Sequence, residues 1–267
     1  RMNAFRKQKK SKKNNKKNKY TNPSKEDIIN QAYKSHSLGL KMRGFGDNCQ
    51  SKKNNKKNKY TNPSKEDIIN QADKFYSQGN ISEAEKYYQL FLNKGFSDAR
   101  VSMNLGGIFY RQGRIKEAEL SLKKAIELNP DFADSHYNLG LILSNNGKLE
   151  EAENSYKRAI ELNPNSASYC CDLGSLLNDR DKIKEAELLY RKAVELNPTY
   201  AKAHSNLGNV LNRLGKTQEA EISTRKAIEL NPQFSIAHYN LGNIFKGLGK
   251  LKEAEISTRK AIELEPN

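Results

Sequence analysis

The chain has 267 residues, of which 36% are apolar and 29% are charged, and its formal net charge is +16. No stretch approaches the run of about 20 apolar residues that a membrane-spanning helix needs, and the basic start lacks the apolar core of a secretory signal. We therefore expect a soluble protein without a membrane span, and we place it in the cytoplasm.

The positive charge lies entirely at the N-terminal end. Residues 1–64 contain 19 Lys or Arg and three acidic residues, whereas residues 65–267 contain 28 of each sign. Large apolar side chains are few in the first segment, so burial cannot offset the entropy of ordering it. We predict a disordered, solubilising tail. Binding of a nucleic acid or an anionic surface by this tail is the alternative, although only Tyr20 and Tyr60 could stack on bases there.

The sequence SKKNNKKNKYTNPSKEDIINQA occurs twice, at 11–32 and 51–72. The second half of each copy begins like a helix, but no second helix follows the first copy to cover its apolar face. Met2 and Met42 are also forty residues apart. We interpret residues 1–41 as a truncated duplicate and Met42 as the native start; a functional bipartite tail is the alternative. Because the chain begins with Arg1 and ends without a closing polar helix, we expect a fragment.

From residue 99 onward the sequence repeats at a constant interval. The units begin at Ala99, Ala133, Ala167, Ala201 and Ser235. Each unit has Leu-Gly at its seventh and eighth places, Ala at its twentieth and twenty-seventh places, and Pro near its end. The apolar spacing predicts two antiparallel helices per unit, for example at 133–146 and 148–163.

Glycine and proline residues mark where these helices end. A glycine follows the first helix in four units, where a left-handed residue is expected, and Asp181 replaces it in the third. Proline stops the second helix. The small Gly and Ala residues allow the two helices to approach closely. Each second helix also places Glu four residues before a base, as at Glu119/Lys123, which we assign to a solvent-exposed face.

These marks closely resemble the tetratricopeptide repeat (TPR) family, in particular bacterial members with O-GlcNAc-transferase-like repeats. The usual Trp of the fourth place is replaced by His136, Cys170, His204 and His238, and Thr224 and Thr258 replace a large residue of the second helix. The resemblance implies an all-α TPR α-solenoid, a right-handed superhelix of antiparallel helix pairs. Residues 65–98 fit as a degenerate capping unit. The expected division is 1–41 (duplicate), 42–64 (tail), 65–98 (cap), and repeats at 99–132, 133–166, 167–200, 201–234 and 235–267.

The resemblance also implies that the first helix of each unit lines a concave groove. Its sixth place carries an amide in four of the five units, and an amide offers a donor and an acceptor to a peptide group. The column is similar to the asparagine ladder of O-GlcNAc transferase. The predicted peptide-binding residues are Asn104, Asn138, Asp172, Asn206, Asn209, Asn240, Asn243, Tyr137 and Tyr239. The alternative is that asparagine recurs at this place only because the repeats are copies of one another, without a role in binding.

Other site chemistries find little support. The fifth places lack the Lys and Arg of a chaperone-binding carboxylate clamp, and no phosphate loop, HExxH motif or nucleophile elbow occurs. The recurring histidines should be a repeat apart, too far for one metal ion, and we expect Cys170 and Cys171 to be buried rather than reactive. We predict a scaffold that binds an extended peptide or partner helix, with no cofactor, no metal and no enzymatic activity. The alternative hypothesis is that the chain is the substrate-presenting arm of a larger glycosyltransferase or sulfotransferase. A third hypothesis is nucleic-acid binding by the tail.

Overall fold

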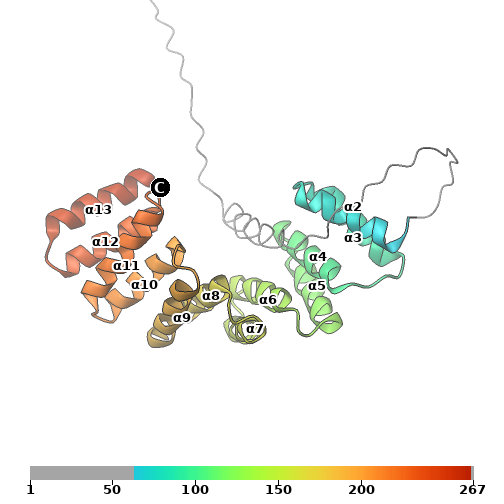
Figure 1. The fold of residues 1–267 in the computed structure, drawn as a ribbon, viewed down its shortest axis with the longest axis horizontal. Helices are drawn as coiled ribbons and strands as arrows, with labels where there is room; N and C mark the ends of the chain where they lie inside the picture. The colour runs from blue at the N-terminus through green and yellow to red at the C-terminus, as the bar shows by residue number, and fades with distance from the viewer. Residues whose placement is uncertain (1–62, 266–267) are drawn as a thin grey trace, which may run out of the picture. The chain divides into compact units, whose positions relative to one another are not determined.

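A computed structural model of the chain describes residues 63–265, which belong to one compact unit. The predictions for the basic tail, the duplicated segment and the start at Met42 lie outside the described residues. Within 63–265 the chain forms twelve helices and no strand (Figure 1).

The helices come in consecutive pairs of similar length. We call the even-numbered member of each pair the first helix and the odd-numbered member the second helix. Their bounds are α2 Lys65–Ser77, α3 Ile81–Asn93, α4 Ala99–Arg111, α5 Ile115–Leu128, α6 Ala133–Asn145, α7 Leu149–Leu162, α8 Ala167–Asp179, α9 Ile183–Leu196, α10 Ala201–Arg213, α11 Thr217–Leu230, α12 Ser235–Gly247 and α13 Leu251–Leu264.

Packing between the pairs follows one rule along the chain. The two helices of a pair pack on each other, and the second helix of each pair packs on the first helix of the next. Some first helices also contact each other directly, as α8 with α10 and α10 with α12. This arrangement confirms the expected all-α solenoid, in which each pair buries its apolar face against its sequence neighbours.

The residues expected to end the first helices do so. Gly113, Gly147, Gly215 and Gly249 have φ between 72° and 76°. Asp181 takes the same left-handed conformation, with φ 61°, in the unit where it replaces glycine. At the N-terminal side, Ser64 and Asp67 form a reciprocal capping box at the start of α2.

Glycine at the eighth place is required by the close approach of the two helices. A Cβ atom added to Gly140 would lie 2.7 Å from a ring carbon of Tyr156, and one added to Gly208 would lie 2.0 Å from the Thr224 hydroxyl oxygen. The glycines therefore accept the side chain that the second helix places over the first. The sequence-based expectation of close helix approach is confirmed.

One expectation about the second helices is wrong. The glutamates that precede a base by four residues do not simply face solvent: Glu153 and Glu187 are 6% and 8% exposed. Each also reaches the loop of the next pair, as in the 2.7 Å contact of Glu187 with Lys216. The same separation along the sequence recurs in Glu85–Arg114, Glu119–Lys148, Glu153–Lys182, Glu187–Lys216 and Glu221–Lys250. We call this set the inter-repeat glutamate ladder.

Candidate functional site

The candidate site is the surface formed by the first helices α4, α6, α8, α10 and α12, which we call the first-helix surface. The predicted residues all lie on these helices, one turn or less from one another within each helix. Their exposure differs. Asn138 and Asn240 are 6% and 5% exposed, Asn104, Asp172, Asn206 and Asn209 are half-buried, and Asn243 is exposed.

Several of the asparagines already use their amide nitrogen inside the chain. Asn240 donates to the Ser205 hydroxyl at 3.1 Å, on the preceding first helix. Asn206 donates to the Ser175 hydroxyl at 3.3 Å in the same way, and Asn104 donates to the hydroxyl of Tyr88 at 2.9 Å. These amides tie neighbouring repeats together, so a ligand meets mainly their remaining donor hydrogen and their carbonyl oxygen.

A charged centre interrupts the asparagine column at α8. Asp172 accepts a hydrogen bond from the Tyr137 hydroxyl at 2.6 Å and forms an ion pair with Lys202 at 2.7 Å. Burial is the largest single influence and lowers the pKa of Lys202, but the charge and hydrogen bond of Asp172, together with the nearby Cys171, exceed it, so the pKa of Lys202 is raised above its usual value. Tyr137 is 8% exposed and stacks on Tyr169 with 4.5 Å between ring centroids. Tyr137 therefore holds Asp172 in place from the buried side of the surface.

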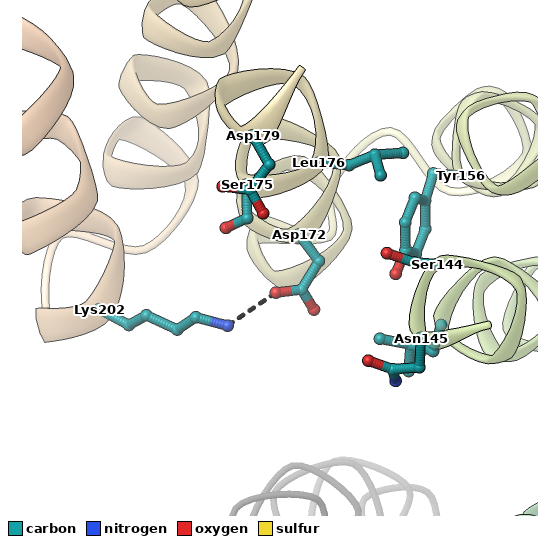
Figure 2. A pocket seen from close by; sticks show the side chains of 9 residues that line it. Ser144, Asn145, Tyr156, Asp172, Ser175, Leu176, Asp179 and Lys202 are labelled. Atoms are coloured by element: carbon teal, nitrogen blue, oxygen red, sulfur yellow. Dashed lines mark hydrogen bonds and ion pairs between the residues drawn. The ribbon is translucent and has the colours of Figure 1, made fainter. Parts of the chain in front are cut away.

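A pocket of about 160 Å³ opens beside this centre. Figure 2 shows α8 on one side, with Asp172, Ser175, Leu176 and Asp179, and Ser144 and Asn145 of α6 on the other. The ring of Tyr156, from the second helix α7, enters between them. Lys202 reaches the pocket from α10, along its ion pair with Asp172. Three consecutive repeats therefore contribute to one small polar pocket.

The C-terminal part of the surface is the more accessible part. Tyr239 of α12 is 54% exposed, and its neighbour one turn along, Asn243, is exposed as well. Asn209 occupies the same place as Asn243 on α10 and is half-buried. An exposed aromatic ring beside amide groups gives this part both an apolar contact and hydrogen-bonding capacity.

The recurring histidines serve the fold. The Nε2 atom of His136 lies 2.8 Å from the carbonyl oxygen of Pro130, and the Nε2 atoms of His204 and His238 lie 3.0 Å from the equivalent proline carbonyls. Each ring thus links a first helix to the end of the preceding second helix. Among the described residues no three His, Cys, Asp or Glu side chains gather as a metal ion would require.

The two adjacent cysteines are free and completely buried, as expected. Burial raises the pKa of the Cys171 thiol to about 12 and also raises that of Cys170. Both thiols are therefore protonated at neutral pH, which removes the thiolate that nucleophilic chemistry would need.

A second cavity, of about 530 Å³, lies between α9, α10 and α11, away from the asparagine column. Its lining includes Val194, Leu207, Leu211 and the 71% exposed Ile222, rimmed by charged residues such as Arg191. Further polar and charged side chains, among them His204, Glu219 and Ser223, also line this cavity. Among residues 63–265, no helix combines the length and apolar character needed to cross a membrane.

Sequence reasoning did not single out Tyr156, Asp179, Lys202 or Ser144 as site residues. Asp179 and Lys202 stand at the thirteenth and second places of their units, and these places face the same surface as the asparagines. Comparing those places across all units would have found them. Tyr156 stands at the large-residue place of the second helix, which sequence reasoning did not consider for the site.

Models of one repeat family match most of the described chain. A TPR repeat model matches residues 106–147 and 174–215. A tetratricopeptide repeat model matches residues 133–166, 201–234 and 235–267, and another matches residues 72–93. The last match falls on α2 and α3, the pair with the most divergent sequence. No curated protein gives a significant match.

Solved structures agree with this assignment. MamA is 27% identical, with a TM-score of 0.56, and the match covers 64% of this chain and 96% of MamA. YrrB, described as a TPR protein with an unusual peptide-binding site, is 23% identical with a TM-score of 0.58 over 67% of this chain and 93% of its own. PilF of Pseudomonas aeruginosa is 20% identical, with a TM-score of 0.57 over 62% of this chain and 75% of its own. YrrB and PilF are less than 25% identical to this chain, so their similarity shows the fold alone. Together with the family matches, which span more than half of the sequence, it establishes that the chain belongs to the tetratricopeptide repeat family.

Proposed function

We propose that the chain is a protein-interaction scaffold that binds an extended peptide or a partner helix on its first-helix surface. The observation that carries the proposal is the run of polar and aromatic side chains across α8, α10 and α12. It joins the pocket at Asp172 to the half-buried Asn209 and the exposed Tyr239 and Asn243.

The chemistry of this run suits a peptide backbone. Side-chain amides offer both a donor and an acceptor, as a peptide group does, and an aromatic ring supplies contact area at a low cost in conformational entropy. A peptide bound there would use Asn209 and Asn243, which make no hydrogen bond to the described part of the chain through their side chains. YrrB, a TPR protein described as having an unusual peptide-binding site, supports the same use of this fold.

The adjacent free thiols support a location in a reducing compartment. Cys170 and Cys171 remain unbridged, as is usual where glutathione keeps thiols reduced. We propose the cytoplasm for this reason.

Peptide selection tests the proposal. The full chain is immobilised and used to select binders from a random library of short peptides, and the dissociation constant of the strongest binder is measured by fluorescence anisotropy. The double variant Tyr239→Ala with Asn243→Ala is expected to weaken binding about tenfold or more, because truncating an aromatic anchor typically costs about 1–2 kcal/mol or more.

The matched control is Ile256→Ser on α13, in the same repeat. Ile256 is 68% exposed but belongs to a second helix. Its substitution should leave the dissociation constant unchanged. Recovery of no binding peptide, or equal weakening by both variants, would contradict the proposal.

A further inference from the structure

The tyrosine at the twenty-fourth place of a repeat normally has a hydrogen-bond partner in its own pair. Tyr88 donates to Asp73 at 2.6 Å, and Tyr190 donates to Ser175 at 3.1 Å. In both cases the partner lies fifteen residues earlier, at the ninth place of the first helix. The same geometry would give Tyr156 a partner on α6.

That partner is missing, because the residue fifteen positions before Tyr156 is Leu141. Tyr156 is 2% exposed, and its ring is held over Gly140 and 5.8 Å from the ring of Tyr137. Its hydroxyl forms no hydrogen bond with any residue of 63–265, yet it is not one of the hydroxyls sealed from solvent there. It therefore meets solvent through the pocket that it lines (Figure 2).

Access to water spares this hydroxyl the cost of a sealed, unpaired polar group. Phenylalanine would fill the same space, so the hydroxyl is not needed for packing. The hydroxyl is thus a polar group positioned by a rigid ring and left available to a ligand in the pocket.

The charges around the pocket do not cancel. Asp172 is neutralised by Lys202 at 2.7 Å and also accepts from Tyr137. Asp179, one helix turn beyond Ser175, is exposed and has no ion pair or hydrogen bond with the described residues. The pocket consequently carries one uncompensated negative charge.

The uncharged groups add acceptors rather than donors. Asn145 uses its amide nitrogen to donate to the Tyr110 hydroxyl at 2.6 Å, which leaves its carbonyl oxygen free. Ser175 donates its proton to the Cys171 carbonyl at 3.0 Å. It also accepts from Tyr190 and Asn206, so it offers a ligand no further group. The Ser144 and Tyr156 hydroxyls can each accept or donate. The surplus of acceptors calls for a ligand with several donors.

We propose that this pocket binds the side chain of an arginine in a peptide lying on the first-helix surface, an inference that rests on the proposed function. A guanidinium is planar, permanently charged and carries five donors, which match the Asp179 carboxylate, the Asn145 carbonyl and the Tyr156 hydroxyl in the lining of the pocket. The volume of about 160 Å³ is roughly tenfold the 10–15 Å³ that a single water molecule needs, enough for the end of one long side chain. The uncompensated charge of Asp179 would repel an acidic residue.

The test uses the peptides selected on the full chain as described above. The inference predicts that they share an arginine at one position. Replacing that arginine by citrulline, which keeps the shape but removes the charge, should weaken binding to the wild type about tenfold. In Asp179→Asn the arginine peptide should bind about fivefold more weakly than to the wild type, while binding of the citrulline peptide should not change.

Two matched pairs of variants separate the pocket from general effects. Glu195→Gln removes another exposed carboxylate, on α9 and outside the pocket, and should preserve the arginine preference. Tyr156→Phe should weaken the arginine peptide about threefold, whereas Tyr190→Phe, whose hydroxyl is bonded to Ser175, should not. Thermal melting of each variant verifies that it is folded.

The outcomes distinguish the inference from the proposed function. Selected peptides without a shared arginine, or an unchanged citrulline penalty in Asp179→Asn, would overturn the arginine pocket while peptide binding stands. Selected peptides that share a lysine instead, and that bind equally well when this lysine is replaced by a neutral residue, would overturn it as well. If no peptide is selected at all, both proposals fall.

Discussion

Thr224 places an unsatisfied polar group in the apolar core of its repeat. It replaces the tyrosine or leucine of other repeats, is completely buried, and its hydroxyl has no hydrogen-bond partner. Thr224→Val keeps the branched shape and removes the unsatisfied group. We expect it to raise the free energy of unfolding by about 1 kcal/mol, measured by urea denaturation.

The equivalent residue of the last repeat provides the control. Thr258 is half-buried, and its hydroxyl is not sealed from solvent. Thr258→Val should therefore change the free energy of unfolding by less than about 0.5 kcal/mol. Equal effects of the two substitutions would show that the buried hydroxyl carries no penalty.

The cysteines allow a second prediction at this scale. Because burial raises the pKa of Cys171 to about 12, its thiol is protonated at pH 8. The pKa of Cys170 shifts in the same direction. We expect iodoacetamide to label both far more slowly in the folded protein than in urea, as measured by mass spectrometry of the peptide that contains them. Labelling at the rate of a free thiol under native conditions would contradict their burial.

At the residue scale the sequence predicted backbone roles better than side-chain environments. The left-handed conformation of Asp181 could be predicted because Gly holds that place in the other repeats. The exposure of the asparagines could not, because it depends on what the neighbouring first helix offers. Asn240 is buried since Ser205 lies within hydrogen-bonding distance, whereas Asn243 has no such neighbour.

At the scale of helices, the inter-repeat glutamate ladder links each second helix to the following pair. Hydrogen bonding from Lys216, opposed by burial and supported by Arg191, lowers the pKa of Glu187. A lowered folded-state pKa contributes stability above the pKa of the unfolded chain, about 4.3 for Glu. That contribution disappears as the pH falls through the lower, folded-state value.

Glu187→Gln should therefore reduce the free energy of unfolding by about 1 kcal/mol at pH 7, and the difference from the wild type should shrink as the pH falls below about 4. Urea denaturation at both pH values measures this. Glu255→Gln is the control, because Glu255 is 62% exposed and pairs only with Arg259 of its own helix among the described residues. A pH-independent loss in Glu187→Gln would mean that shape, rather than charge, is responsible.

The helix pairs themselves were predictable because strong local signals mark their ends. Glycine after the first helix and proline after the second bracket each element, and the expected 148–163 helix appears as α7, Leu149–Leu162. The ladder was misread as a solvent-exposed feature because a spacing of four residues within one helix is visible in a sequence. The longer spacing between a glutamate and its partner in the next repeat becomes meaningful only once the pairs are stacked.

On the scale of the whole described chain, the constant repeat period was sufficient to predict the solenoid. Each pair buries its apolar face only against its neighbours, so the repeat determines the fold. Ligand chemistry is not determined in this way, since it arises where the repeats differ from one another. In the pocket at Tyr156, Leu141 stands where two other pairs place an acceptor, and the net charge comes from Asp179, which the sixth-place column does not include.

The central claim, that a peptide binds the first-helix surface, is tested most directly by photo-cross-linking. The photoreactive amino acid p-benzoylphenylalanine is placed at Asn209 or Tyr239 on the first helices, or at Ile222 beside the apolar cavity of α9–α11. The selected peptide is then added, irradiated and mapped by mass spectrometry. We predict cross-links from positions 209 and 239 and none from position 222; cross-links from position 222 alone would contradict the account and transfer binding to the second helices.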